Sequence, residues 1–140
     1  MFYIMLFVKT AAAAAVIFLV LDHLWFTLFA GKIYFKHLSF LSDTAKEKIV
    51  YKKVPIILSR VVISLSITAA IFMSIIIGGK ISWAVAGGGI AGFALYSAYN
   101  LTALSFIKKW SPFITALDIS WGTLQGMLAG IYVFFITGFL

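Results

Sequence analysis

The stretch GGGIAGFALYSAYN, residues 87–100, decides the fold. Four of its residues recur at every fourth position and therefore lie along one face of an α-helix: Gly88, Gly92, Tyr96 and Asn100. Glycines at this spacing let two helix backbones approach closely inside a membrane. We therefore expect a membrane helix that packs tightly on a neighbour and carries a polar amide at one end of the packed face.

The stretch DISWGTLQGMLAG, residues 118–130, supplies a matching face. Counted away from the loop between the two stretches, Asn100 falls level with Asp118, and Gly92 falls close to the level of Gly126. We expect the two faces to pack together and the Asn100 amide to hydrogen-bond the Asp118 carboxylate. The alternative is a homodimer seam through one face. The expected helix-packing residues are Gly88, Gly92, Gly122, Gly126 and Gly130.

Both stretches lie in long apolar segments. Hydrophobic residues make up 64% of the 140 residues and charged residues 11%, too few polar groups to cover a water-soluble domain. Four segments are long enough to cross about 30 Å of hydrocarbon: residues 2–30, 54–77, 81–107 and 112–140. We expect an all-α, integral membrane four-helix bundle, with residues 1–140 forming a single transmembrane domain.

The distribution of basic residues predicts the orientation. The first and third loops hold the lysines Lys32, Lys36, Lys46, Lys48, Lys52, Lys53, Lys108 and Lys109, whereas the second loop holds Lys80 alone. By the positive-inside rule both termini lie outside the cytoplasm, in a multi-pass protein of a plasma (inner) membrane. Topology accounts for the net charge of +7, so we expect membrane lipids as partners and no nucleic acid.

The first loop has a helical pattern of its own. Tyr34, Leu38, Leu41, Ala45 and Ile49 recur at helical spacing, which predicts an interfacial amphipathic segment in the headgroup region. The capping-box spacing of Thr44 and Glu47 predicts a new helix from there into the second span, bent at Pro55. Ser111 and Pro112 are typical of an N-cap and a first helical residue for the fourth span.

A polar layer crosses all four spans. At 1.5 Å per residue, its members lie about 8–13 Å inside the cytoplasmic ends of their helices: Asp22, Arg60, Asn100 and Asp118. Two carboxylates in a layer of low dielectric constant cannot both ionise cheaply unless a cation lies near them. We expect Arg60 to be that cation, with Ser64 and Thr68 on its face.

A motif recurs in the first and fourth spans, which both read LDxxWxTL, from Leu21 and from Leu117. Because these helices run in opposite directions, we expect Trp25 and Trp121 to point to opposite sides of the layer. The functional interpretation is a ligand site between two Asp-x-x-Trp elements. Its expected residues are Asp22, Trp25, Arg60, Tyr96, Asn100, Asp118, Trp121 and Gln125.

No catalytic motif accompanies the layer, and a single membrane histidine, His23, is weak evidence for a metal. We expect no metal and no cofactor. The chain has no cysteine, so disulfides and thiolate chemistry are excluded.

The chain resembles a family of small bacterial inner-membrane proteins, the domain-of-unknown-function membrane family 2177. The resemblance rests on LDxxW at residues 21–25, YxLTxL at residues 99–104 and DxxWGT at residues 118–123. Similar proteins commonly read YDLTN where this chain has Tyr99, Asn100, Leu101, Thr102 and Ala103, so an amide replaces an acid here. The resemblance implies the fold and the membrane location but no activity.

Three functions stay open at this point. The first is small-ligand binding or transport in the polar layer, with protonation of Asp22 or Asp118 coupled to occupancy. The second is a membrane enzyme acting on a lipid or isoprenoid head group, with an aspartate as general acid or base. The third is an accessory subunit whose polar network is purely structural.

Overall fold

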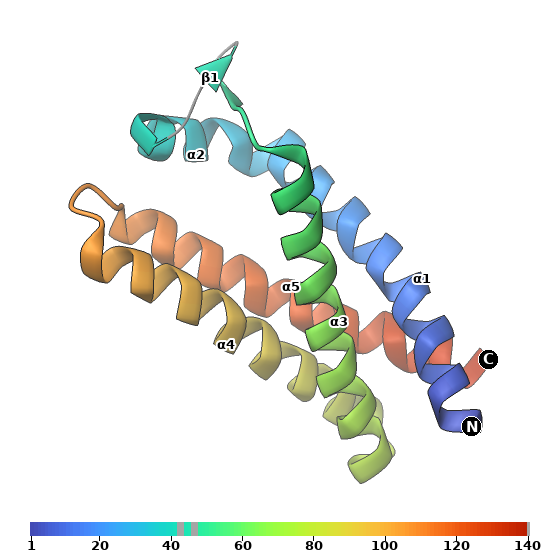
Figure 1. The fold of residues 1–140 in the computed structure, drawn as a ribbon. Coiled ribbons are helices and arrows are strands. Elements are labelled where there is room, and N and C mark those ends of the chain that lie inside the picture. The colour runs from blue at the N-terminus through green and yellow to red at the C-terminus, as the bar shows by residue number, and fades with distance from the viewer. Residues whose placement is uncertain (42–43, 46–47, 140) are drawn as a thin grey trace.

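The computed structural model describes residues 1–41, 44–45 and 48–139. Its long helices are α1 (Phe2–Leu24), α3 (Lys53–Gly78), α4 (Ile81–Phe106) and α5 (Pro112–Phe139). All four are long and apolar enough to cross a membrane. The protein is an all-α membrane bundle, as the composition predicts. Its N- and C-termini lie near each other (Figure 1).

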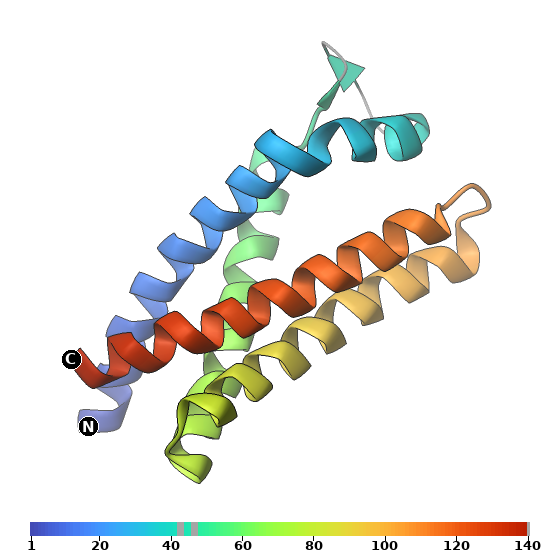
Figure 2. The same cartoon turned by 180° about the vertical axis from the view of Figure 1, so that it is seen from behind.

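Helices α4 and α5 form an antiparallel pair that stays close over its length (Figure 2). A Cβ atom on Gly88 would overlap the carbonyl oxygen of Gly126, and a Cβ on Gly126 would overlap that of Gly88. The same holds for Gly92 against the carbonyl oxygen of Gly122. Only glycine permits backbones this close, so these positions set the distance between the two helices.

Tight turns join the last three helices. Gly79 ends α3 in the left-handed conformation, with φ of 63°, and its N–H donates to the Ile75 carbonyl oxygen at 2.8 Å. Glycine adopts this conformation without the steric cost of a Cβ. At the start of α5, the Ser111 hydroxyl oxygen accepts the Ile114 N–H at 3.3 Å, which is the N-cap that the Ser-Pro pair predicts.

The first helix does not end at residue 30. It passes through a π-helical turn, Trp25–Ala30, into α2 (Gly31–Leu38) and a short 3₁₀ segment, Ser39–Leu41. α2 lies at an angle to α1 (Figure 1), as helices often do at a π-bulge. A Cβ on Gly31 would lie 2.5 Å from the Phe26 carbonyl oxygen, so glycine at this position lets the wider turn form.

α2 is the helical part of the amphipathic segment that the sequence predicts, and its apolar side packs on the bundle. Lys32 and Lys36 are exposed, whereas Tyr34 and Leu38 are buried in a cluster with Trp110 and residues of α4 and α5. The helix therefore caps the bundle with one face and presents its cations on the other.

Two expectations for the first loop are wrong. Residues Thr44–Ala45 (β1) and Lys48–Ile49 (β2) pair as a short antiparallel ladder, and the next helix begins only at Lys53; Glu47 lies outside the described residues. Pro55 consequently falls in the first turn of α3, where its missing N–H would have no partner anyway, and it causes no bend.

The core has two apolar clusters with the polar layer between them. One joins α1, α3, α4 and α5 and includes Phe18, Ile71 and Val133. The other lies at the α2 end and includes Tyr34, Trp110 and Ile114. Outside, large apolar side chains such as Val62 and Ile90 are exposed, as expected for a surface solvated by lipid.

We predict that Gly126→Leu destabilises the bundle. The new side chain cannot fit beside the Gly88 carbonyl, so α4 and α5 must separate, at a cost of about 1–3 kcal/mol or more. Thermal unfolding in detergent measures this loss. Gly138→Leu is the matched control, because a Cβ there meets nothing within 4 Å, and an equal melting temperature for both variants would contradict the packing.

Candidate functional site

The ion pair of the polar layer joins α1 to α3. Arg60 Nε lies 2.9 Å from Asp22 Oδ2, the partner that helical depth predicts. The side chains are 16% and 8% exposed, so neither charge is well hydrated. A buried pair of this kind contributes most by avoiding an unpaired charge.

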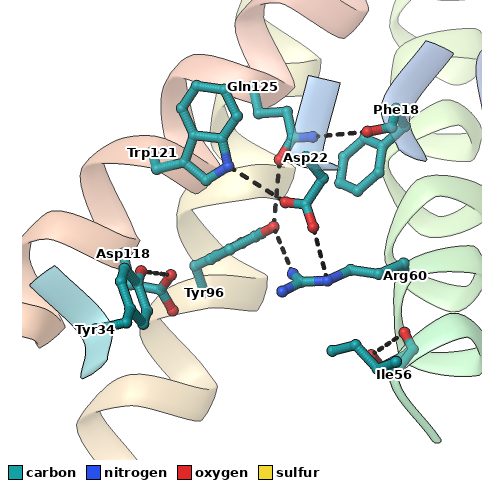
Figure 3. A network of polar contacts seen from close by, with 10 residues as sticks. Phe18, Asp22, Tyr34, Ile56, Arg60, Tyr96, Asp118, Trp121 and Gln125 are labelled. Carbon is teal, nitrogen blue, oxygen red and sulfur yellow. Dashed lines mark hydrogen bonds and ion pairs between the residues drawn. The ribbon is translucent and has the colours of Figure 1, made fainter. Parts of the chain in front are cut away.

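The same guanidinium links the pair to α4 and α5 (Figure 3). Its Nη1 donates to the Tyr96 hydroxyl at 3.3 Å, and that hydroxyl donates to Gln125 Oε1 at 3.3 Å. Gln125 Nε2 in turn donates to the Phe18 carbonyl oxygen at 3.2 Å. Gln125 is fully buried, and these contacts satisfy both ends of its amide.

The second carboxylate has different partners. Asn100 Nδ2 donates to Asp118 Oδ2 at 2.6 Å and also to the Tyr96 carbonyl oxygen at 3.0 Å. The Tyr34 hydroxyl of α2 donates to Asp118 Oδ1. Both donors to Asp118 are neutral groups, so this carboxylate is positioned by hydrogen bonds and not by a cation.

The two tryptophans are not on opposite sides of the layer, and that expectation is wrong. Their rings stack at 4.3 Å between centroids with 4° between planes, and Trp121 Nε1 lies 3.4 Å from Asp22 Oδ1, to which it donates. The reason is depth. Asp22 lies about one helical turn deeper than Asp118, which brings it level with Trp121.

A cavity of about 630 Å³ opens beside this network. Its lining residues come mainly from α2, α3, α4 and α5, at the end of the bundle where the ribbon of α3 diverges from that of α4 (Figure 1). Most of the residues in its wall are apolar or aromatic, including Phe26, Leu38, Ile56, Ile63, Leu95, Tyr99, Trp110 and Ile114. Its volume falls in the range of small-molecule sites.

The structure divides the eight expected ligand residues into two groups. The cavity is lined by Arg60, Tyr96, Asn100 and Asp118. The remaining four do not line it and instead support those side chains through the contacts above, or through the stacked indoles: Asp22, Trp25, Trp121 and Gln125. His23 is exposed and lies near Thr27.

The wall also contains aromatic residues that were not among the expected ligand residues, including Tyr34, Phe26 and Tyr51. Tyr34 is spaced by four residues from Ala30 and from Leu38, and this spacing places all three on one buried face. Phe26 lies under the Arg60 guanidinium at 5.3 Å, a cation–π contact. Tyr51 lines the cavity from the loop, where desolvation raises the pKa of its hydroxyl, so it is a neutral donor at neutral pH.

The class of protein is thus a polytopic four-helix membrane protein with a buried polar network beside an internal cavity. Residues 6–135 match the family described as "Predicted membrane protein (DUF2177)", and the chain belongs to that family. No curated protein and no solved structure matches the chain.

We predict that the Asp22 charge is needed to hold Arg60. Asp22→Asn keeps an acceptor for Trp121 but leaves the buried guanidinium unpaired, which typically costs about 3–5 kcal/mol. Adding Arg60→Met removes that unpaired charge and should recover part of the loss. Thermal unfolding of the single and double variants tests the coupling, and a double variant no more stable than Asp22→Asn would contradict it.

Proposed function

We propose that the chain binds a small amphiphilic ligand in the cavity between α3 and α4, within a bacterial inner membrane and with both termini outside the cytoplasm. The observation that carries the proposal is the cavity itself, whose largely apolar wall includes Arg60, Asn100 and Asp118. An apolar pocket with a few convergent polar groups is the usual form of a small-molecule site.

The position of the cavity favours a ligand that enters from the membrane. Pro55 and Ser59 on α3 and Tyr99 on α4 line it and are also exposed. The lipid-facing surface of the spans therefore continues into the cavity wall. An amphiphile can keep its chain in that apolar part and bring its polar group to the network.

Binding is the step shared by transport and by catalysis. Transport coupled to protons would use Asp118, whose carboxylate lines the cavity. The rival is a membrane enzyme in which Asp118, oriented by Asn100 and Tyr34, serves as general acid or base on a head group. A purely structural network would have no need of an adjoining cavity.

We predict that filling the cavity removes the ligand. Leu95→Trp and Ile56→Trp introduce an indole from opposite walls, so an amphiphile that stays bound to the purified protein should be lost from both. Native mass spectrometry of protein released from detergent measures the bound mass. Leu101→Trp, on the exposed side of α4, is the control, and equal retention in all three variants would count against the site.

We also predict the orientation. The lysine-rich first loop should lie in the cytoplasm, so Lys52→Cys should be shielded from an impermeant thiol reagent in intact cells. Lys80→Cys, in the turn between α3 and α4, should be labelled. The chain has no native cysteine, so each variant gives a clean signal, and the reverse pattern would invert the topology.

A further inference from the structure

The polar wall of the cavity presents acceptors to its ligand. Asn100 Oδ1 is buried in a side chain with no exposed surface and has no hydrogen-bond partner among the residues that the structure describes. The Nδ2 group of the same side chain already donates to Asp118 Oδ2 and to the Tyr96 carbonyl oxygen. A buried acceptor without a donor is costly, and Asn100 lines the cavity, so a donor on the ligand is the partner that fits.

The charges of the polar layer also favour a ligand that is a cation and a donor. Arg60 is already in contact with Asp22, whereas no basic side chain in the described part of the chain forms an ion pair with Asp118. Two carboxylates and one guanidinium leave the layer with one uncompensated negative charge when both acids are ionised. That charge belongs at Asp118, on the cavity wall.

The aromatic wall suits a cation as well. Tyr34, Tyr99 and Trp110 line the cavity with Asp118, and aromatic faces attract ammonium groups, most strongly where water is excluded. Two cations line the cavity, and neither suits a buried anionic head. Lys52 is exposed at the edge of the wall, and Arg60 already has Asp22 at Nε and the Tyr96 hydroxyl at Nη1.

We infer that the ligand of this cavity is an amphiphile with a primary ammonium head, which binds Asp118 and donates an N–H to Asn100 Oδ1 while its chain lies along the apolar wall towards α3 and α4. The inference rests on the proposed function and specifies its ligand class. A primary ammonium has three donors, which suffice for a carboxylate oxygen and an amide oxygen together. A trimethylammonium group has none and could satisfy only the charge.

The test uses the cysteine-free background. Ser59 lies on the cavity wall and is exposed, so in Ser59→Cys an occupied cavity should slow reaction with N-ethylmaleimide. Ser66→Cys is the control, because Ser66 is also exposed on α3 and is not part of the wall. The probes are dodecylammonium, dodecyltrimethylammonium, dodecyl phosphate and dodecanol, compared at equal mole fraction in detergent micelles.

We expect dodecylammonium to protect position 59 at the lowest mole fraction and to leave position 66 unaffected. Adding Asp118→Asn should raise the mole fraction of dodecylammonium needed by about 10- to 100-fold, the loss of one charge-assisted hydrogen bond, with little change for dodecanol. The dodecanol result also reports whether this variant is folded; if it is not, the comparison of dodecylammonium with dodecyltrimethylammonium on the parent protein decides.

The possible failures are distinct. Better protection by dodecyl phosphate, or equal protection by the two ammonium compounds, would overturn the ammonium inference and leave the cavity as a binding site. If no probe protects position 59, or if positions 59 and 66 are protected alike, both this inference and the proposed function fail.

Discussion

The close approach of the α4 and α5 backbones is the constraint on which the rest of the structure depends. Gly88 and Gly126 allow that approach because neither has a side chain where the other's carbonyl lies. With the two helices in this register, the Asn100 amide reaches the Asp118 carboxylate at 2.6 Å. α1 and α3 then pack on the paired helices, and α3 diverges from α4 at the α2 end, where the cavity lies. The packing of the glycines thus also determines where the polar side chains meet. This matters in a membrane, where unsatisfied polar groups are costly.

The two carboxylates of the polar layer have different partners. Asp22 neutralises Arg60 from behind the cavity wall, and Gln125 links Tyr96 to the Phe18 backbone. Asp118 is held by two neutral donors, Asn100 and Tyr34, and lines the cavity. The two acids therefore differ in their partners: Asp22 has a base beside it, whereas Asp118 has no ion-pair partner in the described part of the chain.

Much of this could be predicted from sequence because membrane helices obey simple periodicities. Rise per residue and four-residue spacing indicate that Asn100 meets Asp118 and that Arg60 meets Asp22. What could not be predicted depends on the path of the chain between spans: the paired strands at Thr44–Ala45 and Lys48–Ile49 replace an expected helix. The contact of Tyr34 with Asp118 was missed for a related reason, since it needs α2 to fold back over the bundle. No local pattern encodes the divergence of α3 from α4, so the cavity could be found only in three dimensions.

The π-helical turn at Trp25–Ala30 has a consequence for the phase of the first helix. Before the turn, Ala14, Phe18 and Asp22 form the buried row; after it, the buried row is Ala30, Tyr34 and Leu38. An uninterrupted α-helix would continue the first row near Phe29 and Ile33, but those side chains are exposed. One additional residue in a single turn has therefore rotated everything that follows by about 100°. Because of this rotation, one continuous helix can bury different faces against two parts of the bundle. The rotation also directs the Tyr34 hydroxyl towards Asp118 of α5.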